Sequence, residues 1–466
     1  MPIQLTINEY RNPNVCQKYN EILLRGQIEI INLVQEMKSA FSDQDDFFIQ
    51  DAQFDGTAFF LIGFNTLVDF TKSNLYVRQM AERSASIHEL FLNLSDKLDV
   101  DLAQLKKAVL EGKLVLISES GRNAVMESVP QSLRRSIEEP RNESPIQGPL
   151  DAFGEDIDLN IGLIRKRLGT ERLCLCSYQV GELAKQRISM LYIRGKAQTA
   201  LIEKVDQQLK QIESDIETID DLNKHLGQRI LSPVSHLFAT EVPVQAIHSL
   251  KKNRIVLFLE NQPFALVFPH LISDMLHTAN DRNLPFGLSL MIRALRGLGV
   301  FATLVLPALY VALTSVNPEI LKTDLALFIA ESREGIPLTP VLETLIMTIL
   351  VDLITEAIVR LPKSVGPTVT MVGGVVLGQA MVEAKLVSNL LVIVITFMLI
   401  ASSAVVGVQN ALYIRSLKYP VFILASVYGI VGLIVGLALI SIYLSSLTSC
   451  DIPYMTFRMK GKEDIK

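Results

Sequence analysis

The sequence has no tryptophan and few metal-binding or cross-linking side chains, with four cysteines and six histidines in 466 residues. Cys16, Cys174, Cys176 and Cys450 are too few and too scattered for a disulfide framework. The spacing of Cys174 and Cys176 is wrong for a zinc pair, and the histidines are equally dispersed. We therefore expect no metal and no cofactor, and an aromatic belt at a membrane surface would consist of tyrosines.

Familiar catalytic motifs are also missing. The sequence contains no G-x-S-x-G, no H-E-x-x-H and no G-x-x-x-x-G-K-[ST], although catalytic residues need not be close in sequence. Its net charge is -5 and its charges are mixed, which disfavours a nucleic-acid binder with a basic face. These absences predict a protein that is not an enzyme and has no nucleic-acid partner.

Charge is distributed unevenly along the chain. Charged residues are frequent up to about residue 290, whereas long apolar runs dominate beyond it. Each run is long enough to cross a bilayer, which takes about 20 apolar residues; the runs are Gly297 to Val316, Ser364 to Val382, Leu386 to Ile414 and Tyr419 to Cys450. A fifth, less apolar candidate lies at 335–359. We expect about five transmembrane helices in 286–455, membrane lipid around them, and a short polar tail at 456–466.

The first half reads as an α+β region. Two stretches, 113–128 and 253–268, have the alternation and turn residues of β-hairpins, and each follows a helical pattern. We expect two cytoplasmic subdomains, 1–130 and, with its connector, 131–285. The N-terminus lacks a basic segment followed by an apolar core, so we expect no cleaved secretory signal. The predicted fold is thus an α+β cytoplasmic N-terminal region with two hairpin-containing subdomains, followed by an all-α polytopic transmembrane domain.

A group of charges interrupts the apolar half. We consider these residues candidates for pore lining or gating: Glu331, Arg333, Glu334, Glu343, Asp352, Glu356 and Arg360. A charge facing lipid costs roughly 2.5 to 3.5 kcal/mol, so such groups face protein, water or the interface. Glu343 lies nearly opposite Asp352 on a helix, so at least one of them must meet a neighbouring helix or the interface. Pairing at a membrane surface is an equally good interpretation, and the segment around 318–335 is predicted to be interfacial or re-entrant.

Small residues and one proline mark helix contacts in the apolar half. Gly374 with Gly378, and Gly432 with Gly436, have the G-x-x-x-G spacing that allows helix backbones to approach closely. Pro307 lies within the first apolar run and could kink it, with Thr303 or neighbouring helices compensating the lost hydrogen bond.

Basic residues only partly predict how the spans are oriented in the membrane. Arg293 and Arg296 precede the first run, while Arg415 and Lys418 lie between the last two, which favours a cytoplasmic position for both sites. Five spans would then place the basic C-terminal residues outside, against the same rule. The number of spans and the side of the C-terminus therefore stay open.

Several long motifs resemble one family, the A subunits of nutrient germinant receptors in endospore-forming bacteria. They include "NIGLIRKRL", "QPFALVFP", "LPALYVALTSVNPEILKTDLALFIAESREGIPLTPVLETLIM" and "VGGVVLGQAMVEAKLVS". The resemblance extends over about 110–455, and "TEVPVQAI" at 240–247 departs from the family's more charged pattern. The residues that match the family's soluble signature are Arg135, Ser136, Glu138, Glu139, Pro140, Arg165 and Arg167.

This resemblance implies a function that composition and spacing do not. It implies an inner-spore-membrane, multi-pass homo-oligomer that passes monovalent cations or transduces a signal. Its partners would be a permease-like B subunit, which binds the nutrient, and a lipoprotein C subunit. A stage V sporulation AF-type germination channel subunit shares these motifs and is an alternative. A secondary transporter is an alternative of another class, although we find no inverted repeat to support it.

Overall fold

The computed structural model describes residues 28–54, 56–119, 122–129, 149, 151–228, 232, 234–278, 281, 283–361, 374, 376, 378–450 and 452–457. These residues form two compact units. The N-terminal unit contains the described residues up to Gly227 and those from Leu237 to Pro269. The helical unit contains those from Gln228 to His236 and from His270 to Phe457.

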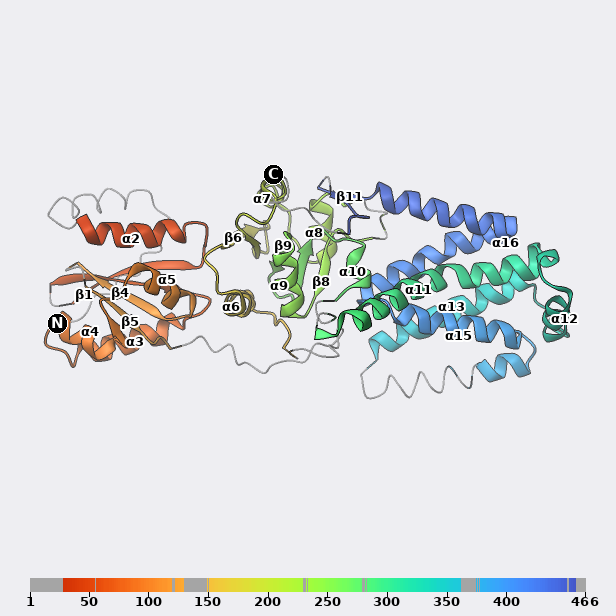
Figure 1. Ribbon diagram of the computed structural model, residues 1–466, viewed down its shortest axis with the longest axis horizontal. Coiled ribbons are helices and arrows are strands. Elements are labelled where there is room, and N and C mark those ends of the chain that lie inside the picture. Colours follow the sequence, from red (N-terminus) through yellow and green to blue (C-terminus); the bar gives the residue numbers. More distant parts are fainter. Residues whose placement is uncertain are drawn as a thin grey trace. The chain divides into compact units, whose positions relative to one another are not determined.

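The first subdomain of the N-terminal unit is built on a five-stranded antiparallel sheet (Figure 1). Its elements are α2 (Ile28–Ala40), β1 (Phe47–Phe54), β2 (Thr57–Phe64), α3 (Phe70–Ala81), α4 (Ile87–Leu94), β3 (Lys97–Leu98), α5 (Leu102–Leu110), β4 (Leu114–Ser118) and β5 (Asn123–Met126). Every residue of β4 and β5 is buried, and successive side chains point to opposite faces, so both faces of these strands are covered.

The second subdomain repeats this plan. Its elements are α6 (Ile157–Leu168), β6 (Leu173–Val180), β7 (Gln186–Ile193), α7 (Thr199–Lys210), α8 (Ile219–His225), β8 (Phe238–Thr240), α9 (Pro243–Lys251), β9 (Ile255–Leu259) and β10 (Ala265–Phe268). The strand orders are β1-β2-β4-β5-β3 and β6-β7-β9-β10-β8, so corresponding strands occupy corresponding positions. The two hairpins predicted from the sequence are β4–β5 and β9–β10.

Local signals fix the position of α6, which carries two family-signature arginines. Asp156 caps its start by accepting the Asp158 N–H at 2.9 Å and the Leu159 N–H at 3.3 Å. Gly169 ends it in a left-handed conformation with φ +48°, which a glycine adopts without steric cost.

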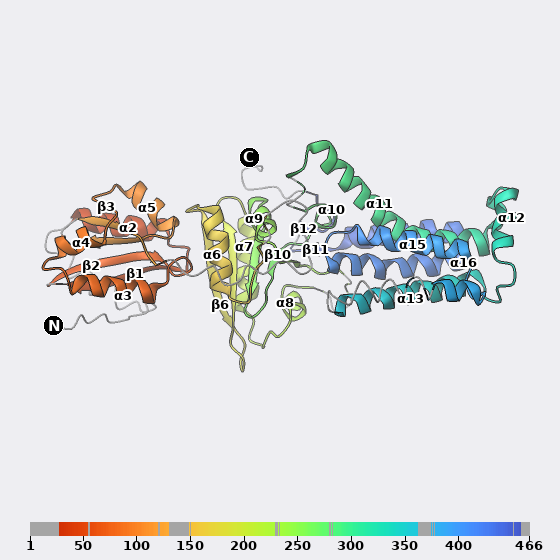
Figure 2. The same ribbon diagram turned by 90° about the horizontal axis from the view of Figure 1, so that it is seen from below.

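The helical unit consists of long helices that run side by side, with a shorter helix at one end (Figure 2). Its elements are α10 (Ser273–Leu276), α11 (Phe286–Val311), the π-helix η2 (Ala312–Val316), the 3-10 helix η3 (Pro318–Ile320), α12 (Thr323–Ser332), α13 (Pro340–Arg360), α15 (Asn389–Ser403), α16 (Val408–Ser446), β11 (Thr448–Ser449) and β12 (Ile452–Pro453). By length and composition, two of the described helices could cross a membrane, Phe286–Val316 and Gln409–Ser446.

Helix α16 folds back on itself at Gly429, which has φ +62° and ψ -136°. In a straight helix, residues 421 and 436 would lie about 22 Å apart. Instead, a Cβ built on Gly436 would lie 3.0 Å from the Val421 Cα. The two limbs, 408–428 and 430–446, therefore pack against each other as a hairpin. Asn317 stabilises the turn, because its Oδ1 accepts the Ile430 N–H at 3.1 Å.

The helix boundaries correct the spans expected near the C-terminus. Arg415 and Lys418 do not lie in a loop between two spans, because both are inside the first limb of α16. The break falls at 404–407 instead, where Gly407 has φ +81°. Lys418 is tolerated inside a helix bundle because a carboxylate neutralises it, as described below. Most of the expected run 364–382 lies outside the described residues.

Candidate functional site

Arg333 and Glu343 are brought together by the turn between α12 and α13. Gly335 has φ +82° in this turn, a conformation that costs a glycine little. Helix α13 then begins with two start signals: the Thr339 hydroxyl accepts a backbone N–H at 3.4 Å, and Pro340 occupies the first helical position. The first turn of α13 thus presents Glu343 to Arg333.

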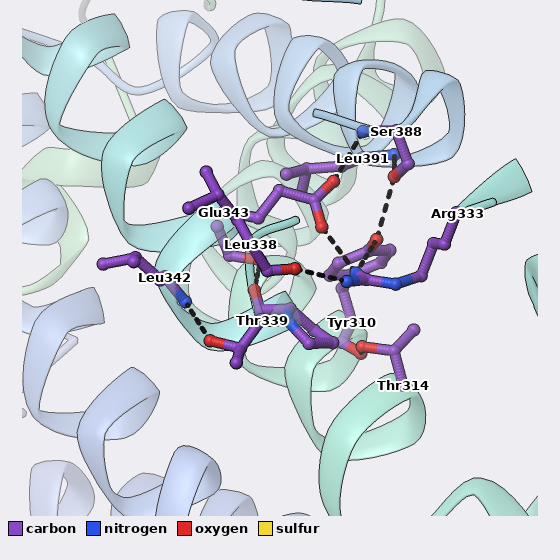
Figure 3. A network of polar contacts seen from close by, with 11 residues as sticks. Tyr310, Thr314, Arg333, Leu338, Thr339, Leu342, Glu343, Ser388 and Leu391 are labelled. Atoms are coloured by element: carbon purple, nitrogen blue, oxygen red, sulfur yellow. Dashed lines mark hydrogen bonds and ion pairs between the residues drawn. The ribbon is translucent and has the colours of Figure 1, made fainter. Parts of the chain in front are cut away.

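Glu343 is at the centre of a network of polar contacts (Figure 3). Its Oε2 lies 2.5 Å from Arg333 Nη1, and its Oε1 accepts the Ser388 N–H at 2.6 Å. Arg333 also donates to Leu338 O at 3.0 Å and to the Tyr310 hydroxyl at 3.4 Å. That hydroxyl lies 3.0 Å from Ser388 Oγ. The network, which we call the Glu343 network, joins α11, the end of α12, α13 and the start of α15.

Its electrostatics explain how a carboxylate survives in the bundle. The Glu343 side chain has no exposed surface, and that of Arg333 is 15% exposed. An ion in such a place loses several kcal/mol of solvation, which only a close partner and further hydrogen bonds can restore. Ser388 is the N-cap of α15, so Glu343 also faces the positive end of a helix dipole. The arrangement gives the buried carboxylate a cationic partner, a backbone N–H donor and the start of a helix.

A second buried cluster surrounds Asp352, on the opposite face of α13. Its Oδ1 lies 2.8 Å from Lys418 Nζ, and its Oδ2 accepts the Tyr419 hydroxyl at 2.5 Å. The Lys418 side chain is 1% exposed, whereas that of Asp352 is 25% exposed. Arg415 lies on the same helix limb and donates to Ser402 Oγ at 3.3 Å. We call these residues the Asp352 cluster.

The remaining charged candidates lie near solvent or lipid. Arg360 Nη2 lies 2.6 Å from Glu356 Oε1, the ion pair that their spacing predicts, but both side chains are substantially exposed. Glu331 and Glu334 are exposed at the end of α12. The structure therefore places the seven sequence candidates in four kinds of surroundings. Arg333 and Glu343 form a buried pair, and Asp352 is paired with another helix. Glu356 and Arg360 form an exposed pair, and Glu331 and Glu334 are exposed acids.

Sequence reasoning missed three partners of these carboxylates, Ser388, Lys418 and Tyr419, and the tyrosine that contacts Arg333, Tyr310. Tyr310, Ser388 and Tyr419 are ordinary residues of apolar runs, and the sequence places Lys418 between the last two runs. The sequence does give a partial signal for Lys418 and Tyr419. The two are adjacent at the start of an apolar run, and buried side chains of this kind need a polar partner. Nothing in the local sequence identifies Asp352 as that partner, since 66 positions separate it from Lys418.

The small residues behave differently in the two G-x-x-x-G pairs. A Cβ on Gly432 would lie 2.0 Å from Leu424 O, so this glycine permits the close approach of the two α16 limbs. For Gly374 and Gly378, a Cβ would meet no atom of the described residues within 4 Å, and helix packing through them stays a prediction. Pro307 is buried inside α11, which continues through it.

The soluble signature is only partly visible. Arg165 is fully buried, and Arg167 lies 2.6 Å from Asp151 Oδ2 within the second subdomain. The other signature residues lie outside the described residues: Arg135, Ser136, Glu138, Glu139 and Pro140. Within the part of the chain that the structure describes, no three His, Cys, Asp or Glu side chains gather as metal ligands.

Comparisons with known proteins identify the family. A model described as Bacillus/Clostridium GerA spore germination protein matches residues 35–465. The uncharacterized membrane protein YfkQ of Bacillus subtilis (strain 168) is 32% identical over 387 residues, covering 83% of this chain and 75% of that protein. Spore germination protein A1 of the same strain is 30% identical over 420 residues, covering 88% and 87%.

The comparisons also include a solved structure. It is the crystal structure of the N-terminal domain of the A subunit of the Bacillus megaterium spore germinant receptor GerK3, which has 18% sequence identity and a TM-score of 0.39. The alignment covers 51% of this chain and 94% of that domain. Since the family match extends over most of the sequence, the chain belongs to the GerA family of spore germination proteins.

Proposed function

We propose that this chain is the A subunit of a nutrient germinant receptor and couples nutrient sensing to the release of monovalent cations during spore germination. Family membership and the names of its relatives support the role in germination, and the motifs that resemble germinant-receptor A subunits favour the receptor. In this proposal a permease-like B subunit and a lipoprotein C subunit are its partners. Several copies of the chain assemble in the inner spore membrane, with the N-terminal unit on the cytoplasmic side.

Side chains on the helical unit support its insertion in lipid. Large apolar groups are exposed along its helices, among them Leu298, Phe301, Ile393, Phe397, Ile423 and Ile434. A soluble protein rarely exposes so much apolar surface. The two apolar helices that are long enough to span a bilayer belong to the same unit. We therefore assign the helical unit to the membrane as a multi-pass domain.

The Glu343 network is the main structural support for coupling between nutrient sensing and cation release. A buried ion pair adds less stability than apolar packing would, but removing one partner is strongly destabilising. Such a pair therefore favours one arrangement of the helices that it connects. We assign the Glu343 network and the Asp352 cluster to holding the closed arrangement. Glu356 is the most exposed of the three carboxylates on α13, and we assign it to a cation path in an oligomer.

The test compares three variants in spores: Glu356→Gln, Asp352→Asn and, as a control, Asp324→Asn, whose side chain is exposed at the start of α12. The measurement is potassium release after addition of the single amino acid or sugar that triggers the parent spores, with immunoblots for protein level. We expect slower release for Glu356→Gln, altered nutrient dependence for Asp352→Asn, and parental behaviour for the control. Parental release in both test variants at normal protein level would overturn the proposal.

A further inference from the structure

The two subdomains of the N-terminal unit have separate apolar cores. The buried apolar residues of the first lie at 37–126, and those of the second at 153–267. No residue belongs to both clusters among the described residues. Packing of apolar side chains in these two clusters therefore stabilises each subdomain from within.

A short segment of the first subdomain lies along the edge of the second sheet. This segment, 43–46, connects α2 to β1 and forms a parallel bridge with β6. Asp45 N donates to Leu175 O at 3.2 Å, and Leu175 N donates to Asp43 O at 3.0 Å. Ser177 N donates to Asp45 Oδ2 at 2.6 Å. The segment thus extends the second sheet beyond β6.

Arg165 reaches the same segment from α6, and its side chain has no exposed surface. Its Nη1 donates to Gln44 Oε1 at 2.7 Å, and its Nη2 lies 2.6 Å from Asp46 Oδ1. Its Cζ lies 4.0 Å from the centroid of the Phe64 ring, in the first subdomain. Asp46 is held in place by the Thr66 hydroxyl, which donates to its Oδ2 at 2.6 Å. The Asp46 carboxylate of this ion pair is therefore oriented from within the first subdomain.

The contacts of Arg165 with residues 43–46 fix one relative position of the two subdomains more than they add to stability. Burial lowers the pKa of Arg165, which the neighbouring Asp46 opposes. A planar guanidinium that makes two directed bonds and stacks on a ring fits one arrangement, and a lysine would not replace it. When such a pair is displaced, both charges lose their partners, so intermediate positions are disfavoured.

We propose that residues 43–46 and Arg165 form a polar lock that fixes the position of the two subdomains relative to each other, and that opening of this lock is a conformational change built into the N-terminal unit. The lock joins two independently packed bodies through polar contacts that can be exchanged for water. The inference does not depend on the proposed function, because it concerns distances within the chain.

The test measures the distance between the subdomains in the full chain in detergent micelles. Spin labels are attached to Lys107→Cys and Lys210→Cys, whose native side chains are 76% and 65% exposed. Cys16, Cys176 and Cys450 are changed to serine, while the buried Cys174 is kept. Pulsed electron paramagnetic resonance should show one distance population with the lock intact. Arg165→Met should produce a second population, and Gln44→Ala a smaller share of it.

Arg167→Met is the matched control, because Arg167 lies on the same helix and its partner, Asp151, belongs to the same subdomain. It should leave the single population unchanged. If Arg165→Met does not fold, Gln44→Ala decides the test, since it removes two hydrogen bonds to the second subdomain, with Arg165 and with Glu171 O, and no charge. An unchanged population in the Gln44 variant and in every folded Arg165 variant would overturn the proposal. So would an equal change in the Arg167 control.

Discussion

Glu343 Oε2 lies 2.5 Å from Arg333 Nη1, and the Glu343 side chain has no exposed surface. Ten positions separate the two residues, and each belongs to a different helix or helix end. The pair is therefore a product of the turn at Gly335 rather than of one helix face. Its burial makes the consequences of removing one partner measurable.

Glu343→Ala should destabilise the helical unit strongly. The change leaves Arg333 without its carboxylate and the Ser388 N–H without its acceptor. Breaking a buried pair in this way costs about 3 to 5 kcal/mol of the free energy of unfolding. Thermal unfolding in detergent, followed by circular dichroism, measures the loss. Glu331→Ala is the control and should change that free energy by less than about 0.5 kcal/mol, because Glu331 is exposed.

A double variant tests whether the loss of stability in Glu343→Ala comes from the broken ion pair or from lost packing. Arg333→Met combined with Glu343→Leu removes both charges and keeps much of the volume, so it should be less destabilising than Glu343→Ala alone. If the double variant loses more stability than the single one, the ion pair is not the reason for the effect.

Lys418→Met should destabilise the chain less than Glu343→Ala does. It leaves the Asp352 carboxylate with the Tyr419 hydroxyl as its remaining partner among the described residues. Asp352 is 25% exposed, however, so it is less completely buried than Glu343. We expect a loss of about 1 to 3 kcal/mol in the free energy of unfolding. Arg360→Met is the comparison, since that side chain is 78% exposed and its pair should contribute less than about 1 kcal/mol. Equal losses in the two variants would contradict the assignment of Lys418 to the interior.

Gly429→Ala should disrupt the α16 hairpin. A Cβ at this position would lie 1.8 Å from Asn317 Oδ1, and the backbone conformation is one that residues other than glycine rarely adopt. We expect a loss of at least about 3 kcal/mol in the free energy of unfolding. Gly297→Ala, inside α11, is the matched control: a Cβ there meets no atom of the described residues within 4 Å, and alanine favours a helix by about 0.5 to 1 kcal/mol. A tolerated Gly429→Ala would show that the turn has another geometry.

The Asp281 carboxylate should make stability depend on pH in the acid range. Burial raises its pKa, but hydrogen bonds from Arg296 and Thr278 outweigh burial and hold the pKa at about 2. A lowered folded-state pKa adds stability above the unfolded pKa of about 4, here about 2.5 kcal/mol, and this is lost as pH falls from about 4 to 2. Asp281→Asn should therefore unfold at a lower temperature than the parent at pH 7.

The difference between Asp281→Asn and the parent chain should shrink as pH is lowered through this window. Asp324→Asn provides the control, because Asp324 is exposed at the start of α12. A difference that stays constant from pH 7 to pH 2.5 would mean that the Asp281 carboxylate is not held in its charged form by Arg296.

Local patterns were sufficient for much of the N-terminal unit. The hairpins β4–β5 and β9–β10 follow from alternating apolar residues with turn residues between them. We do not predict the β1–β2 hairpin from the sequence, because we assign no structure to these phenylalanine-rich strands. Gly56, with φ +73° between Phe54 and Thr57, was the available signal.

The helical unit was harder to predict for a physical reason. Uniformly apolar sequence shows where lipid or protein covers a helix, but it does not show where the helix turns. A single glycine, Gly429, converts one long run into two limbs. The charged partners were equally hidden, since Glu343 and Asp352 are paired by residues on other helices. Sequence could state that these carboxylates need partners, but not which ones.

The hairpin in α16 also bears on whether the number of membrane crossings is odd or even. Ile272 N, which precedes α11, donates to Tyr454 O, which follows the second limb, at 3.0 Å. The turn at Gly429 lies beside Asn317, beyond the far end of α11. The backbone thus leaves the helical unit where it entered. If the proposed membrane location holds, the number of crossings is even, and the conflict between five spans and a basic C-terminal sequence disappears.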